Sequence, residues 1–179
     1  MIMKTTRDDH RIAWLTGLAI LIHMLESTLP SPLPGVKPGL ANVITLIVLM
    51  MYGWSAACWV TLLRILVGSL LLGTFLSPTF LLSLSGALTM LAAAATTRLA
   101  PAAFGPIGLS VLMAIAHIAG QFAVAYTLFI PHQGLFSLLP LLMTAAVAFG
   151  LINGLISQAV LRRLGHPTTA LDPARREHP

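Results

Sequence analysis

Six long apolar stretches alternate with short polar or proline-containing breaks along this chain. They cover residues 12–29, 40–52, 54–73, 79–97, 107–130 and 138–161. None shows the period-2 alternation of a membrane barrel strand, and five have 18 or more residues, close to the length that crosses a bilayer as a helix. The pattern predicts an all-α integral membrane protein with a six-helix transmembrane bundle over residues 12–161. The tails, 1–11 and 162–179, are predicted to be cytoplasmic, and we expect the second to be disordered.

The break between the first two stretches carries four prolines, Pro30, Pro32, Pro34 and Pro38. Each removes a backbone donor and disfavours helix before it, so this segment is predicted to be extended. The next apolar stretch has only 13 residues, about 20 Å of helix against about 30 Å of hydrocarbon. We therefore predict a short, broken and partly re-entrant second helix. Such backbone is tolerated in a membrane where protein buries it or where it lines a cavity, which makes this region the first candidate for a site.

Composition supports the membrane class. Hydrophobic residues make up 57% of the chain and charged residues 8%. The basic residues concentrate in the two tails, which argues against a nucleic-acid partner and favours the lipid bilayer. With six crossings, all basic clusters fall on one side, and the positive-inside rule makes that side cytoplasmic. We expect a multi-pass protein of the inner (plasma) membrane with both termini cytoplasmic. The clusters are Lys4, Arg7 and Arg11, then Arg98, then Arg162 and Arg163.

Polar side chains within the apolar region are the candidates for ligand binding, because intramembrane ionisable groups are costly to bury. Two bases against one acid leave a surplus positive charge, which favours a small anionic ligand such as a carboxylate or phosphate. The alternative is structural: a buried Glu26–Arg64 ion pair, with His117 and Gln121 satisfying backbone or hydroxyl groups. The candidate residues are Glu26, Lys37, Asn42, Arg64, His117 and Gln121.

Small residues at four-residue spacing predict close helix contacts. Ala146, Gly150 and Gly154 form one such row, and Ala116 with Gly120 forms another. Packing within the protein is the first interpretation and a partner interface the second. A further pair, Ala13 and Gly17 near the start of the first helix, could face a partner.

Catalysis is not predicted. Prenyl-transfer enzymes hold magnesium with paired aspartate-rich motifs, whereas here only Asp8 and Asp9 are adjacent, in the tail. No metal-ligand spacing surrounds His23 or His117, and no phosphate-binding glycine loop is present. We therefore expect no enzyme activity, no cofactor, no metal and no ATP hydrolysis by this chain.

Four runs, residues 25–42, 63–75, 83–87 and 116–121, resemble the family named heptaprenyl diphosphate synthase component I, also called the Gx transporter family. Pro38 and Ile118 depart from its usual Leu and Asn. The family is similar to the six-helix S components of energy-coupling-factor transporters. The resemblance implies a solute-binding membrane component driven by a separate ATPase module through a transmembrane coupling subunit. S components contact that subunit through an Ala-x-x-x-Ala pair, which Ala13 and Gly17 match approximately.

The predicted function is therefore uptake of a small anionic or amphipathic solute. The alternative is a non-catalytic accessory subunit in isoprenoid quinone synthesis, at the heptaprenyl diphosphate step, or in a membrane redox complex.

Overall fold

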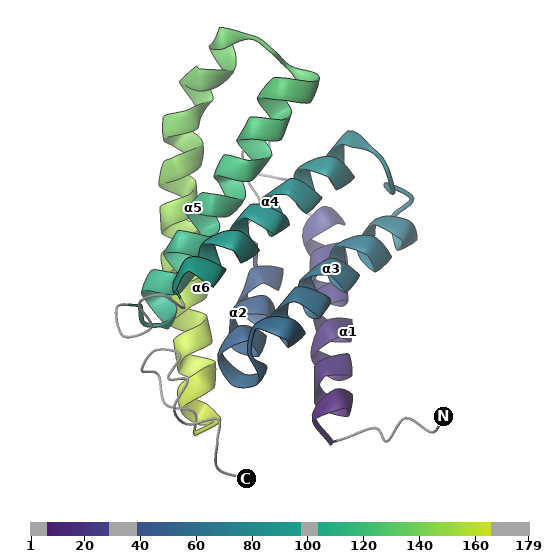
Figure 1. Ribbon diagram of the computed structural model, residues 1–179, viewed down its shortest axis with the longest axis vertical. Coiled ribbons are helices and arrows are strands. Elements are labelled where there is room, and N and C mark those ends of the chain that lie inside the picture. Colours follow the sequence, from purple (N-terminus) through teal and green to yellow (C-terminus); the bar gives the residue numbers. More distant parts are fainter. Residues whose placement is uncertain (1–6, 29–38, 98–103, 166–179) are drawn as a thin grey trace. The chain divides into compact units, whose positions relative to one another are not determined.

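A computed structural model describes residues 7–28, 39–97 and 104–165, and the regular structure in these residues is helical throughout (Figure 1). The predicted apolar stretches correspond to its six α-helices within a few residues. Helix α1 begins earlier than predicted, inside the segment predicted to be a tail, and α5 ends earlier, at Val124. The helices are α1 (Arg7–Thr28), α2 (Ala41–Tyr52), α3 (Trp54–Leu71), α4 (Pro78–Thr96), α5 (Pro106–Val124) and α6 (Leu139–Arg163).

The helices fall into two compact units, α1 to α3 and α4 to α6. A single six-helix bundle therefore stays a prediction. The short second helix is present, with 12 residues. Residues 29–38, where the break and re-entrance were predicted, lie outside the described residues, as do residues 166–179 of the second tail.

In the first unit, α2 and α3 form an antiparallel hairpin around a single linking residue, Gly53. Its φ of 85° and ψ of −171° belong to a region that is essentially restricted to glycine. Residues at equal distance from Gly53 therefore meet across the hairpin, for example Thr45 and Thr61, eight positions before and after it. Helix α1 packs against both helices of the hairpin.

In the second unit, α5 packs between α4 and α6, and the α5–α6 pair is visible as two adjacent ribbons in Figure 1. A Cβ added at Gly150 would lie 2.9 Å from the Val111 Cα, and one at Gly154 would lie 2.7 Å from the Ile107 Cα. A Cβ at Gly120 would collide with Thr89 of α4. The small-residue rows thus pack within this unit, which confirms the first of the two interpretations.

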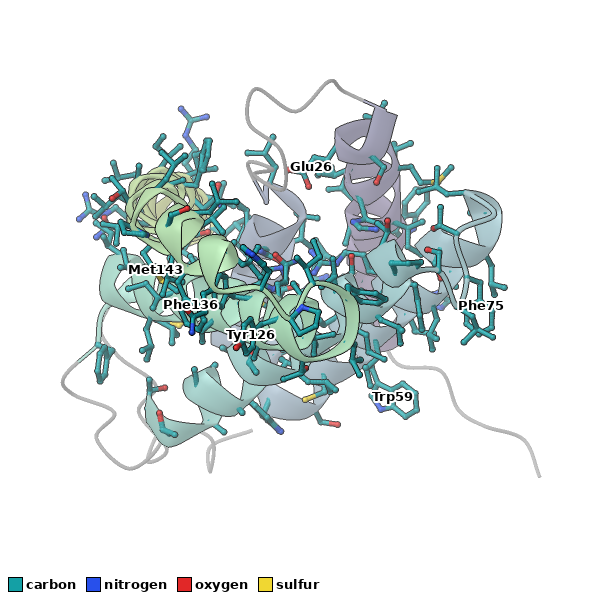
Figure 2. The ribbon with its side chains drawn as sticks, turned by 90° about the horizontal axis from the view of Figure 1, so that it is seen from above. Glu26, Trp59, Phe75, Tyr126, Phe136 and Met143 are labelled. Atoms are coloured by element: carbon teal, nitrogen blue, oxygen red, sulfur yellow. The ribbon has the colours of Figure 1, made fainter. Side chains whose placement is uncertain are left out.

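Helix α5 continues through a π-helical turn, Ala125–Phe129, and a 3-10 helix, Gln133–Leu138, leads into α6. The Phe136 ring makes T-shaped contacts with Tyr126 and Phe122, with centroid distances of 5.0 and 5.2 Å. This aromatic contact packs the connection between α5 and α6 against the end of α5 (Figure 2).

Among the described residues, four helical segments are long and apolar enough to cross a membrane. Large apolar side chains cover their outer faces, as expected for contact with lipid, and Trp59 of α3 is 62% exposed (Figure 2). The chain is a multi-pass membrane protein. Helix α2 is too short to be counted with the four, and α1 carries charged residues at both ends. The four segments are Trp54–Leu71, Pro78–Thr96, Pro106–Phe129 and Gln133–Arg163.

Candidate functional site

The carboxylate of Glu26 caps the start of α2. Glu26 lies near the end of α1 and is 7% exposed (Figure 2). Its two oxygens accept hydrogen bonds from the backbone N–H groups of Leu40, at 2.6 Å, and Ala41, at 3.4 Å. N–H groups at a helix start have no acceptor within the helix, and the helix dipole favours a negative charge there. Glu26 therefore fastens α1 to the first turn of α2.

Arg64 lies on α3 across from the same turn. It is 3% exposed, and its Nη2 donates to Asn42 Oδ1 at 3.0 Å. Asn42 and Arg64 stand 11 positions before and after Gly53, so the hairpin register brings them together. The Arg64 Nε–H is also buried, and the residues that the structure describes provide no hydrogen-bond acceptor for it. Among the described residues, one nitrogen of the charged guanidinium, Nη2, is thus bonded and another, Nε, has no acceptor.

Glu26 and Arg64 do not pair directly in the part of the chain that the structure describes. The carboxylate contacts α2 backbone and the guanidinium contacts Asn42, although the Glu26 charge does act favourably on Arg64. The first turn of α2 links the two side chains. This corrects the structural alternative of a direct Glu26–Arg64 ion pair.

Lys37, the second base of the predicted cluster, lies outside the described residues. The described part of the cluster holds one acid and one base. The predicted surplus of positive charge therefore depends on Lys37 and stays a prediction.

Two further contacts join the helices of this unit. The Thr45 and Thr61 hydroxyls lie 3.1 Å apart between α2 and α3, and both residues are fully buried. On α3, Gly68 leaves room for the His23 ring of α1, since an added Cβ would lie 2.8 Å from its Cδ2. Sequence reasoning missed both contacts, yet the equal spacing of the two threonines from Gly53 was a usable signal for the first.

His117 and Gln121 belong to the second unit, on α5. Both lie against Gly86 of α4, where an added Cβ would be 2.7 Å from His117 Cε1 and 2.9 Å from Gln121 Cγ. The structure therefore brings Glu26, Asn42 and Arg64 together in one unit, and His117 and Gln121 together in the other. Their roles in ligand binding stay predictions.

The predicted partner pair lies on an exposed face of α1. Ala13 and Gly17 are both exposed, and a Cβ added at Gly17 would have no heavy atom within 4 Å. Trp14 beside them is 81% exposed. In the described ranges, no group of three or more His, Cys, Asp or Glu side chains could hold a metal ion.

Comparison with protein families gives one match. A family model described as heptaprenyl diphosphate synthase component I matches residues 15–160, most of the chain and every α-helix at least in part. Comparison with curated proteins and with solved structures finds no significant match. The chain belongs to the heptaprenyl diphosphate synthase component I family, in agreement with the resemblance seen in its sequence.

Proposed function

We propose that this member of the heptaprenyl diphosphate synthase component I family is the membrane-embedded, solute-binding component of a transporter, similar to an energy-coupling-factor S component. Its solute is small and anionic or amphipathic. The observation that carries the proposal is the buried Arg64, held by Asn42 at the start of a helix too short to span the bilayer.

The energetics of the membrane support this proposal. A charged side chain at the centre of a membrane helix costs about 2.5–3.5 kcal/mol on insertion scales. The cost of burying Arg64 must therefore be offset by hydrogen bonds or by a bound ligand. Asn42 satisfies only part of its hydrogen-bonding capacity. Short helices that begin inside a membrane protein commonly form solute sites in transporters.

We propose further that the chain is not itself an enzyme. Its adjacent acids, Asp8 and Asp9, stand at the charged start of α1, far in sequence from Glu26 and Arg64. Transport then requires ATPase subunits and a transmembrane coupling subunit. The exposed face of α1 around Ala13 and Gly17 is the surface that we propose for the coupling subunit.

The test is identification of the bound solute. The full chain is purified in mild detergent, and small molecules released from it are identified by mass spectrometry. The parent and Thr61→Val should retain the same anionic or amphipathic solute, and Arg64→Gln should lose it. Thr61→Val is the matched control, because it changes a buried polar contact one turn away on α3 without altering charge. A solute profile identical in all three proteins would contradict the proposal.

A second candidate follows from the family description, which names a synthase component and so favours a non-catalytic accessory subunit of heptaprenyl diphosphate synthesis. Affinity purification of the full chain from its native membrane separates the two. Enrichment of ATPase and coupling subunits favours transport. Enrichment of a soluble prenyl synthase subunit, with heptaprenyl diphosphate formation that depends on this chain, favours the accessory role.

A further inference from the structure

We propose that Arg64 binds one oxyanion group, a carboxylate or a phosphate, through the edge that carries its Nε–H, and that Glu26 does not contact the ligand. This inference rests on the proposed function and assigns the chemical class that its site recognises. It begins with the buried Nε–H, for which the described ranges hold no acceptor, in a residue that is 97% buried.

A buried N–H without an acceptor is uncommon, because it loses its bond to water and gains nothing in return. The loss is larger for a charged group. Nη2 carries two N–H bonds, so its bond to Asn42 leaves one further donor. In the planar guanidinium, the Nε–H points parallel to one Nη2–H, and such an edge matches two oxygens of a carboxylate or phosphate.

The ligand must be an acceptor, because a guanidinium offers donors only. Glu26 does not fill this role in the described structure, since its oxygens accept N–H groups of the α2 start and the Arg64 Nε–H stays unbonded. The partial positive charge of that helix start offsets part of the Glu26 charge, which leaves Arg64 incompletely neutralised. A ligand with a single negative charge on two oxygens completes the cluster.

Two sources supply this chemistry: a solute dissolved in water or the phosphate of a lipid headgroup. The experiment therefore has two arms, both with the full chain. In detergent, thermal unfolding is measured with added sodium phosphate or sodium acetate, against sodium chloride at equal ionic strength. In nanodiscs without phosphate buffer, unfolding is compared between phosphatidylglycerol and digalactosyldiacylglycerol, a bilayer-forming lipid whose headgroup has no phosphate.

We expect the oxyanion to raise the midpoint of unfolding of the parent and of Thr61→Val by several degrees. Arg64→Gln should lose this shift, and Arg64→Lys should lose most of it, because lysine keeps the charge but not the paired donors. A shift that depends on Arg64 in detergent identifies a free oxyanion, and one seen only in nanodiscs identifies a headgroup. Either result supports the proposal.

Equal shifts in Thr61→Val and in both Arg64 variants, or no shift of the parent in either arm, would overturn it. If Arg64→Gln does not fold, Arg64→Lys and Asn42→Ala provide the comparison. The outcomes also separate this inference from the proposed function. A bound solute without any oxyanion would leave transport standing and remove the inference, whereas oxyanion binding without solute uptake would do the reverse.

Discussion

Glu26 is a charged residue in an apolar helix whose neighbours need a negatively charged acceptor. Its carboxylate satisfies two N–H groups at the start of α2 and acts favourably on Arg64. Removing it would take the acceptor from those two N–H groups and a favourable negative charge from the Arg64 guanidinium. Asn42 and Glu26 therefore share the burial cost of Arg64, Asn42 through a hydrogen bond and Glu26 through its charge.

We predict that Glu26→Ala lowers the free energy of unfolding by about 3 kcal/mol, the scale for removing one member of a buried charged group. Glu26→Gln should cost less, since its carbonyl still accepts one N–H. Unfolding in mixed micelles, followed by helical circular dichroism, gives the measurement. Ser27→Ala is the control, because the Ser27 hydroxyl donates to the His23 carbonyl of its own helix. Equal losses for Glu26→Ala and Ser27→Ala would contradict the capping role.

At the scale of elements, the α2–α3 hairpin sets the register of the candidate site. Gly53 is its single linking residue, and its backbone angles are strained for any residue with a Cβ. Every pairing across the hairpin, including Asn42 with Arg64, depends on this turn.

Gly53→Ala should therefore destabilise the protein by about 1–3 kcal/mol, the usual cost of such strain. Gly17→Ala is the matched control, since it lies inside α1 with open space around it. Alanine there should be neutral or stabilise by up to about 1 kcal/mol. The two variants are compared by thermal unfolding in the same detergent. A Gly53→Ala protein as stable as Gly17→Ala would show that the turn is not restrictive.

The close packing of α5 against α6 leads to a second prediction about a glycine. A Cβ at Gly154 would meet the Ile107 backbone, so Gly154→Ala should cost about 1–3 kcal/mol by overpacking. Gly108→Ala, on the exposed side of α5, should change stability little, because its nearest neighbour is 3.7 Å away. Unfolding of the two variants in one detergent measures the difference. Similar stabilities would mean that the α5–α6 contact can relax without cost.

The sequence predicted the helices well, because each apolar stretch ends at a glycine, proline or polar group. Part of the site could also be predicted from the sequence, since Asn42 and Arg64 are equally distant from Gly53. The partners of Glu26 could not be predicted, because its carboxylate bonds backbone N–H groups, which every residue type except proline has. Gly86 was missed for a related reason: room for His117 and Gln121 is provided by an absent side chain.

At the scale of the whole molecule, the orientation of the chain follows from alternation of its helices. Arg162 and Arg163 occupy the last turn of α6, where basic residues also complement the helix dipole. If each of the six helices reverses the direction of the chain, α1 begins on the side where α6 ends. The α3–α4 and α5–α6 connections then lie on the opposite side.

Topology reporters test this arrangement. Fusions before Met1 and after Arg163 should both be cytoplasmic, and insertions after Thr74 and after His132 should both be exposed on the outer side. The second pair is the internal control, because Thr74 and His132 lie in connections on either side of two predicted crossings, α4 and α5. Opposite locations for the two termini would mean that α2 does not reverse the chain across the bilayer. Helix α3 would then cross in the opposite direction. Arg64, which lies past the midpoint of α3, would be in the inner half of the bilayer and not in the outer half, from which a solute enters.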